Sequence, residues 1–152
     1  MGTMRELYTQ VIMDHCQRPR NKGELGNADL KEHLLNPLCG DEVTVYAVFD
    51  GGKVADARFE GRGCSISQAS TSVLTDLLIG KKVDDALEIH STFVELMQSR
   101  GKVEPDEDIL EDGIAFAGVA KFPGRVKCAL LGWMAWKDAT ARVVVDVEGS
   151  VT

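Results

Sequence analysis

The chain has 152 residues, 44% hydrophobic and 27% charged, with a formal net charge of −7 at pH 7. This length suits one domain, and the apolar content argues against wholesale disorder. The acidic balance argues against nucleic acid or an anionic membrane surface as the principal partner. Uncharged stretches fall far short of the roughly 20 residues of a membrane span, and the N-terminal pattern is not that of a secretory signal, so we expect a cytoplasmic protein.

The first half of the chain predicts one helix and a hairpin. Apolar residues recur every three or four positions over residues 4–16, which is typical of an amphipathic helix. Residues 21–36 contain glycines without a clear period and are predicted to form a loop. Two runs rich in β-branched and aromatic residues, 43–50 and 54–60, flank Asp50-Gly51-Gly52 and predict a β-hairpin.

The second half is predicted to be mainly helical. Ser65 followed by Gln68 resembles a capping box and predicts a helix over residues 65–79. Apolar spacing predicts a second helix over about 84–99, capped by an aspartate, and a last helix over about 125–138. The two tryptophans of the last helix are predicted to lie in the core.

Two segments interrupt this helical half. Six of the nine residues 104–112 are acidic, which predicts a solvated surface loop, with docking of a basic partner as the alternative. Glycine and proline predict a loop over residues 117–125. Residues 141–147 are rich in β-branched side chains but lie in a tail, 139–152, that the pattern does not assign. The order of helix, hairpin and helices predicts a single α+β domain over residues 1–152.

Four cysteines, Cys16, Cys39, Cys64 and Cys128, are spread along the chain. In a chain without a secretory signal, such cysteines are more often buried, catalytic or metal-bound than paired in disulfides. Cys16 falls within a predicted helix, where a small buried apolar residue is the ordinary interpretation. The other three lie at the ends of predicted elements, where functional sites tend to form.

A metal site is one interpretation of those three cysteines. Cys39, Cys64 and Cys128 with the carboxylate of Asp41 make a closed tetrahedral donor set of the kind that zinc accepts, and Gly40 allows the backbone between Cys39 and Asp41 to fold closely. The spacing matches no short zinc-finger pattern. From the residues alone, a metal or thiol site and inert cysteines both remain open.

Several motifs resemble the iron–sulfur cluster assembly family of IscU, the NifU N-terminal domain and SufU. The resemblance covers about residues 4–138 and includes Leu7-Tyr8, His15, Pro19-Arg20-Asn21, Asn36-Pro37, Cys39-Gly40-Asp41, Gly61, Gly63-Cys64, Ile66-Ser67, Ala69-Ser70 and Arg125-Val126-Lys127-Cys128-Ala129. It implies a SufE/NifU-like α+β fold, with an antiparallel sheet of about three strands packed against several helices. One strand would lie near residues 28–35. It also implies that Cys39, Asp41, Cys64 and Cys128 are the metal ligands.

Three departures from IscU-type scaffolds favour the SufU branch. Lys127 replaces the histidine that precedes the last cysteine in those scaffolds. Phe122-Pro123-Gly124-Arg125-Val126 replaces their Pro-Pro-Val-Lys stretch, and the acidic segment 101–113 is similar to an insertion typical of SufU. The resemblance therefore implies a zinc-binding sulfur acceptor that takes persulfide sulfur from a SufS-type cysteine desulfurase and passes it toward a SufBCD-type scaffold.

Within this hypothesis we expect Cys39 to accept the sulfur and Arg125 to support the transfer. Two alternatives stay open at this point. One is an IscU-like scaffold that assembles a transient [2Fe–2S] cluster on the same ligands. The other is a structural zinc module that binds a partner. No nucleic acid or membrane partner is expected in any of the three.

Overall fold

The computed structural model describes residues 2–36 and 40–148, and Cys39 lies outside them. Along this part of the chain the elements run in the order α1 (Gly2–Gln17), β1 (Leu30–Asn36), β2 (Asp41–Asp50), β3 (Lys53–Arg62), α2 (Ser65–Leu78), α3 (Val83–Gln98), α4 (Glu107–Leu110), a 3₁₀-helix η1 (Glu111–Lys121) and α5 (Pro123–Glu148). The chain therefore has the expected α+β architecture, with its strands grouped in the first half.

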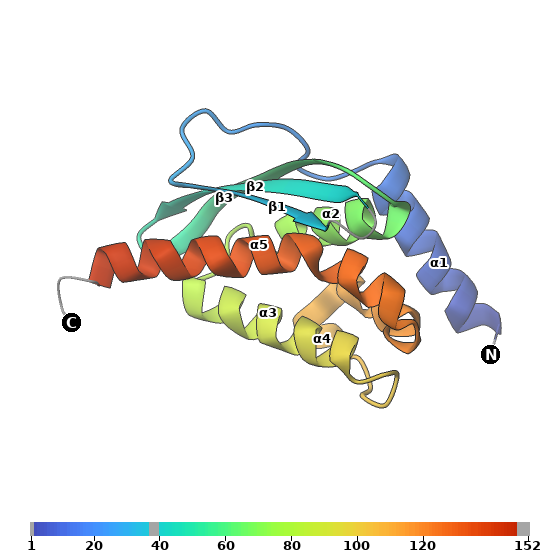
Figure 1. Ribbon diagram of the computed structural model, residues 1–152. Coiled ribbons are helices and arrows are strands. Elements are labelled where there is room, and N and C mark those ends of the chain that lie inside the picture. The colour runs from blue at the N-terminus through green and yellow to red at the C-terminus, as the bar shows by residue number, and fades with distance from the viewer. Residues whose placement is uncertain (1, 37–39, 149–152) are drawn as a thin grey trace.

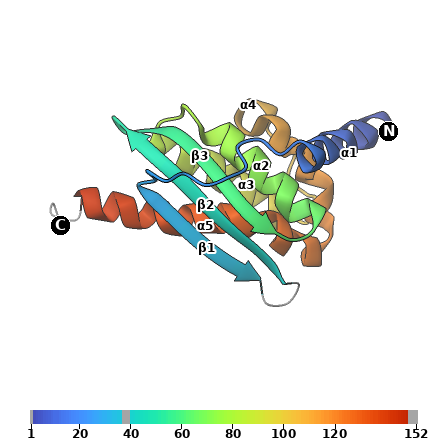
Figure 2. The same cartoon turned by 90° about the horizontal axis from the view of Figure 1, so that it is seen from above.

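The three strands form one antiparallel sheet in the order β1-β2-β3. Alternate residues of β2, among them Val43 and Val45, are buried, because successive side chains of a strand point to opposite faces. Helices α2 and α5 cover one face of the sheet, with α5 beneath β1, and α3 packs on α5 on the side away from the sheet (Figures 1 and 2). Residues 21–23 pair with the outer edge of β3, where Gly23 N–H donates to Phe59 O over 2.8 Å.

Strand β1 confirms the strand implied by the family resemblance and corrects the loop predicted from the pattern alone. Its residues pair with β2 from Leu30 opposite Ala47 to Asn36 opposite Asp41. Only Leu30 is fully buried, and the remaining burial alternates between exposed and intermediate. An edge strand that buries so little apolar surface gives a weak period, so tertiary pairing decides its conformation.

Aromatic residues from three elements form the centre of the helical layer. Phe93 of α3 stacks on Trp133 of α5 with ring centroids 3.9 Å apart and planes 6° apart. Phe116 of η1 meets Phe93 edge-on, with centroids 5.9 Å apart. Trp133 and Trp136 are 0% and 1% exposed, which confirms that the tryptophans are core residues.

The acidic segment is more ordered than the predicted surface loop. Leu110, Gly113, Phe116 and Val119 are all buried, and they recur at intervals of three residues. Side chains three residues apart lie above one another on a 3₁₀-helix, so this spacing places one continuous apolar row against the core. The prediction of a loop over 117–125 is also wrong. Residues 117–121 belong to η1, and α5 begins at Pro123.

Helix α5 is longer than predicted at both ends. It begins at Pro123, because proline is well suited to the first position of a helix, where its missing N–H costs nothing. It continues through residues 141–147, which the sequence pattern did not assign, to Glu148. No helix in the described part of the chain combines the length and apolar character needed to cross a membrane.

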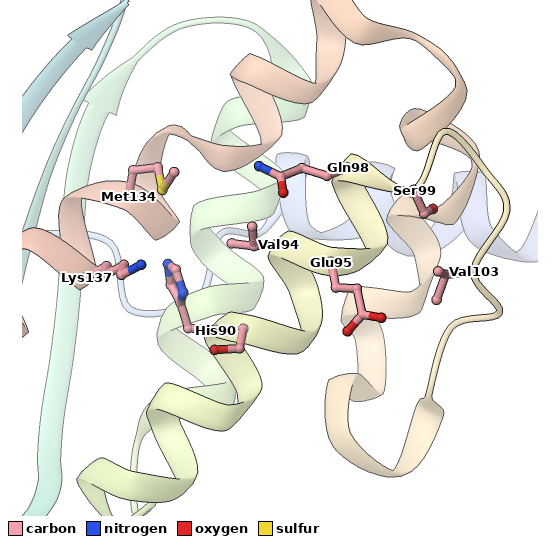
Figure 3. A pocket seen from close by; sticks show the side chains of 9 residues that line it. His90, Val94, Glu95, Gln98, Ser99, Val103, Met134 and Lys137 are labelled. Carbon is pink, nitrogen blue, oxygen red and sulfur yellow. The ribbon is translucent and has the colours of Figure 1, made fainter.

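Helices α3 and α5 leave a hollow of about 430 Å³ between them, lined in part by His90, Val94, Met134 and Lys137 (Figure 3). The His90 ring is 3% exposed, and its Nε2–H donates to the carbonyl oxygen of Trp133 over 2.9 Å. Burial lowers the pKa of His90 below its usual 6.5, although the bond to Trp133 acts in the opposite direction. The native state therefore holds His90 as a neutral imidazole near neutral pH.

This lowered pKa predicts a specific loss of stability in mild acid. As the pH falls below about 6.5, the unfolded state binds a proton at His90 before the native state does, so the free energy of unfolding decreases. A His90→Gln variant keeps an amide donor near the Nε2 position but does not titrate. Denaturant unfolding at about pH 7.5 and about pH 5.5 should show the wild type losing more stability than the variant. Equal losses in the two proteins would contradict a lowered His90 pKa.

Candidate metal centre

Asp41 is the first residue of β2, and its side chain is buried at 3% exposure. Both carboxylate oxygens face Cys64. The backbone N–H of Cys64 donates to Oδ1 over 3.0 Å, and the Cys64 thiol donates to Oδ2 over 3.4 Å. A buried carboxylate needs such partners, because leaving its charge uncompensated is costly. Asp41 therefore ties the start of β2 to the start of α2.

Cys64 occupies the N-cap position of α2, with φ −69° and ψ 165°. The predicted capping box is therefore wrong: Ser65 is already the first helical residue, and no side chain caps the helix. The Ser67 hydroxyl instead donates back to the carbonyl oxygen of Cys64 over 3.1 Å.

Gly63 leaves the space that this contact needs. A Cβ atom at this position would lie 2.6 Å from Asp41 Oδ1 and 2.7 Å from Ser67 Oγ, well inside van der Waals contact. A larger residue would therefore displace the carboxylate or the first turn of α2. Sequence reasoning noted this glycine as part of a family motif but did not identify its steric role.

Cys128 reaches the same place from the second turn of α5, rather than from the first turn as predicted. It is 8% exposed, and its sulfur lies 3.9 Å from the carbonyl oxygen of Gly124. Next to it, α2 and α5 are held together by the Ser70 hydroxyl, which donates to Ala129 O over 2.6 Å and accepts from Trp133 Nε1–H over 2.8 Å. This Ser70 bridge fixes the distance between the helices that carry Cys64 and Cys128.

One ligand atom each from Asp41, Cys64 and Cys128 lies within 4.8 Å of the other two. In a tetrahedral site with bonds of about 2.3 Å to sulfur and about 2.1 Å to oxygen, a sulfur and an oxygen lie about 3.6 Å apart. The 3.4 Å separation of Cys64 Sγ and Asp41 Oδ2 is close to that value. The three residues therefore fit a zinc ion with little rearrangement, and they leave one position for a further ligand.

The other residues singled out in the sequence fall around this group. Cys39 lies outside the described residues. On one side of it Asn36 ends β1 and pairs with Asp41, and on the other side Gly40 has a φ of +74°. Arg125 is exposed in the first turn of α5, three residues before Cys128. Cys16 is half-buried on α1 and packs against the core, apart from the other two described cysteines.

A Gly63→Ala substitution tests the steric argument. Because the added methyl group would overlap the Asp41 carboxylate, we expect the free energy of unfolding to fall by about 1–3 kcal/mol. Gly118→Ala is a matched control, since a Cβ there meets nothing within 4 Å. Chemical denaturation of both variants measures the difference. Equal stability of Gly63→Ala and the control would show that the carboxylate has room to move.

Comparison with known proteins agrees with this geometry. The family model described as NifU-like N terminal domain matches residues 7–129. The zinc-dependent sulfurtransferase SufU of Bacillus subtilis (strain 168) is 46% identical over 136 residues, covering 90% of each chain. The iron–sulfur cluster assembly scaffold protein IscU of Streptococcus pyogenes serotype M1 is 40% identical over 142 residues, covering 93% of this chain and 87% of its own.

The fold agrees as well. The crystal structure of the N-terminal part of a nitrogen-fixing NifU-like protein from Brucella abortus superposes with a TM-score of 0.82 at 25% identity, covering 91% of this chain and 94% of that one. Sequence and fold lead to the same conclusion: the chain belongs to the family of NifU-like N-terminal domains.

Proposed function

We propose that this protein is a zinc-binding sulfurtransferase of iron–sulfur cluster assembly. It accepts persulfide sulfur from a SufS-type cysteine desulfurase and passes it to a SufBCD-type scaffold. The observation that carries the proposal is the convergence of Asp41, Cys64 and Cys128 within 4.8 Å at the junction of β2, α2 and α5. The similarity to the Bacillus sulfurtransferase supports the choice of chemistry.

In this proposal Cys39, Asp41, Cys64 and Cys128 hold the ion. Three sulfurs and one oxygen are a donor set that suits zinc, and hard cations such as Mg²⁺ prefer all-oxygen shells. When bound, zinc keeps the thiolates deprotonated at neutral pH and adds no redox chemistry of its own. The four anionic ligands exceed the charge of the ion and leave a formal charge of about −2 at the site.

Arg125 has a supporting role in the proposal. It and Lys127 are exposed on the first turns of α5, on either side of Val126 and close in sequence to Cys128. Cations beside an anionic site lower the cost of its charge, and an exposed guanidinium is also suited to a carboxylate on a partner protein. We assign Arg125 mainly to the encounter with the desulfurase, because an exposed cation contributes little to binding an ion that is already enclosed.

Cys39 is the proposed sulfur acceptor. Cys64 is exposed at the N-cap of α2, but its N–H and its thiol both bond the Asp41 carboxylate. Cys128 is itself buried on α5 beside the Ser70 bridge, so moving either sulfur would break contacts that hold the site together. Cys39 belongs to the connection between β1 and β2, next to Gly40. In the transfer step the Cys39 thiolate attacks the outer sulfur of the desulfurase persulfide; a new S–S bond forms, the old one breaks, and the desulfurase thiolate leaves.

A second candidate function is a scaffold on which a transient [2Fe–2S] cluster is assembled. The similarity to the streptococcal protein, which is described as a scaffold, favours it. Cysteine thiolates are the usual ligands of such clusters, so the same residues would serve. Metal analysis and the visible spectrum of protein purified without air separate the two, because zinc gives a colourless protein and a cluster gives a brown one.

The first test of the proposal is zinc stoichiometry. We expect one tightly bound zinc ion per chain, lost when Cys39, Cys64 or Cys128 is replaced by serine or Asp41 by alanine, because each change removes one of four ligands. Cys16→Ser is the matched control and should keep the full zinc content, since Cys16 packs on α1 away from the site. Elemental analysis gives the result. Zinc loss in the Cys16 variant with retention in the Cys128 variant would reverse the assignment.

The second test identifies the sulfur acceptor. After incubation with desulfurase and cysteine under non-reducing conditions, mass spectrometry should find an adduct of about 32 Da, one sulfur atom, on the peptide that contains Cys39. In the same assay Arg125→Ala should keep its zinc and acquire the adduct more slowly. Lys102→Ala, which removes an exposed lysine in the segment between α3 and α4, should behave as wild type. An adduct on Cys64 or Cys128 instead would overturn the acceptor assignment.

A further inference from the structure

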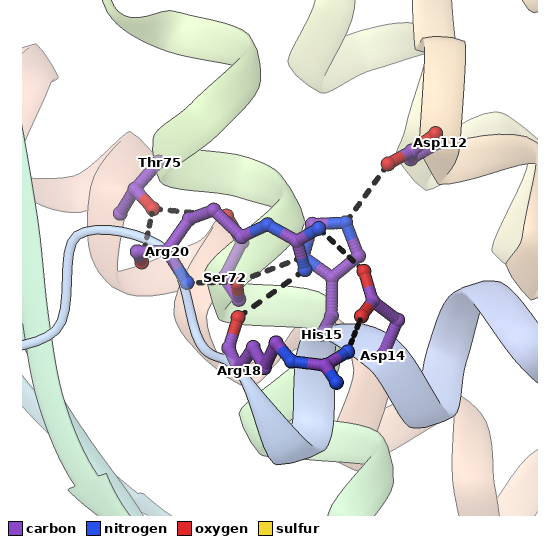
Figure 4. Close-up of polar contacts among 7 residues, drawn as sticks. All are labelled: Asp14, His15, Arg18, Arg20, Ser72, Thr75 and Asp112. Carbon is purple, nitrogen blue, oxygen red and sulfur yellow. Dashed lines mark hydrogen bonds and ion pairs between the residues drawn. The ribbon is translucent and has the colours of Figure 1, made fainter.

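His15 is a buried side chain that joins the buried Ser72 to Asp112, whose carboxylate is 54% exposed, and the proposed chemistry does not use it. Its side chain, near the end of α1, is 1% exposed, and both ring nitrogens have partners (Figure 4). Nδ1 lies 2.8 Å from Ser72 Oγ on α2, and Nε2 lies 2.9 Å from Asp112 Oδ2 at the start of η1. One side chain therefore joins three elements that are far apart in sequence.

The neighbours of the His15 ring determine which atom donates and which accepts in each hydrogen bond. Ser72 Oγ accepts the backbone N–H of Arg20 over 2.8 Å, so its own hydrogen is available to donate to His15 Nδ1. The hydrogen on Nε2 is then donated to the Asp112 carboxylate. Every polar atom around the ring is satisfied in this arrangement, as expected of buried polar groups.

The backbone beside Asp112 needs an anchor. Glu111 has φ 47° and ψ −121°, a conformation that non-glycine residues rarely adopt and that persists only when its surroundings enforce it. On one side the fully buried Leu110 fixes the chain, and on the other the Asp112 carboxylate is held by His15. The contact with His15 therefore contributes to holding η1 in its place.

The two hydrogen bonds of His15 connect it to the metal centre through two helices, α2 and η1. Ser72 lies on α2, the helix that begins at Cys64. Asp112 is the second residue of η1, which runs to Lys121 and connects through Phe122 to the first turns of α5 and to Cys128. A 3₁₀-helix of this length has strained hydrogen bonds and depends on tertiary contacts to keep its position. His15 therefore contacts both of the segments that position the two described sulfurs.

We propose that His15 is a positioning residue for the metal centre. By holding Asp112 against α2, it fixes η1 and hence the first turns of α5, which keeps the sulfur of Cys128 within reach of Cys64 and Asp41. The proposal rests on the metal-binding part of the proposed function. Because the Ser70 bridge also holds α5, removing His15 should loosen the site rather than abolish it. His15 bonds none of the ligands, so we expect a change in metal affinity of about 10-fold, the lower end of the range for residues that bond a ligand directly.

Two substitutions of His15 are each expected to keep a different one of its two hydrogen bonds. His15→Gln places an amide near the Nε2 position and can keep the bond to Asp112, whereas His15→Asn places one near the Nδ1 position and can keep only the bond to Ser72. If Asp112 is the important partner, zinc release to a chelator should be about 10-fold faster than wild type in the Asn variant and close to wild type in the Gln variant. Asp112→Ala should match the Asn variant, and the double variant should add nothing further.

Two controls separate positioning from a general loss of stability. Ile89→Val trims the core on α3, and Arg18→Gln breaks the exposed ion pair with Asp14 on the same helix as His15. Neither should change zinc release or the visible spectrum of the cobalt-substituted protein, which reports ligand geometry. The inference is overturned if His15→Asn releases zinc no faster than Ile89→Val at equal stability, or if the effects of His15→Asn and Asp112→Ala simply add.

A metal-free measurement keeps this inference distinct from the proposed function. Amide hydrogen exchange of the zinc-free protein should be faster over residues 112–128 in His15→Asn than in the wild type, with little change in β2 and β3. Unchanged exchange in that segment would overturn the inference even where zinc binds as proposed. If the wild type binds no zinc, the proposed function is refuted. If exchange over residues 112–128 is nevertheless faster in His15→Asn, the anchoring of α5 by His15 is still supported.

Discussion

The contact between Asp41 and Cys64 is the constraint on which the rest of the site depends. A carboxylate at 3% exposure is stable only if nearby donors replace its water, and the N-terminus of α2 provides them through the Cys64 N–H. The absence of a side chain at Gly63 permits this approach. The same interaction that compensates a buried charge thus brings an oxygen and a sulfur to the spacing that a tetrahedral metal requires.

Helix α2 is the element through which the other parts of the molecule are positioned. Its buried face is rich in small hydroxyl side chains, among them Ser67, Ser70, Thr71, Ser72 and Thr75. Because these side chains are short, neighbouring helices can approach closely, as Gly132 of α5 does at Thr71. Their hydroxyl groups also form hydrogen bonds, such as that from Thr71 to the carbonyl oxygen of Ser67. Ser70 bonds α5 and Ser72 bonds α1, so a single helix fixes the direction from which each neighbour approaches the metal centre.

The sequence predicts the elements with strong periodicity and misses those that tertiary contacts decide. The hairpin β2–β3 and helices α2 and α3 were predicted within a few residues, because their apolar spacing is regular. Strand β1 was found only through the family resemblance, since an edge strand with one fully buried residue has little pattern. Helix η1 was missed because it begins inside the acidic stretch, which resembles a solvated loop, and because the glycines that follow suggest a loop as well.

The metal ligands illustrate the same division. Cysteine type and motif predicted Asp41, Cys64 and Cys128, and the structure brings those three together. The contacts that hold them were not predictable, because Gly63, Ser70 and His15 act through neighbours that lie far away in sequence. No spacing rule connects His15 with Asp112, which is 97 residues further along the chain.

The most direct test of this account is X-ray absorption at the zinc edge of the purified protein. The account predicts a shell of about three sulfurs at roughly 2.3 Å and one oxygen at roughly 2.0–2.2 Å. The Cys16→Ser variant should show the same shell, because Cys16 is not one of the ligands. A shell dominated by nitrogen and oxygen, or the short metal–metal distance of an iron–sulfur cluster in place of zinc, would contradict it.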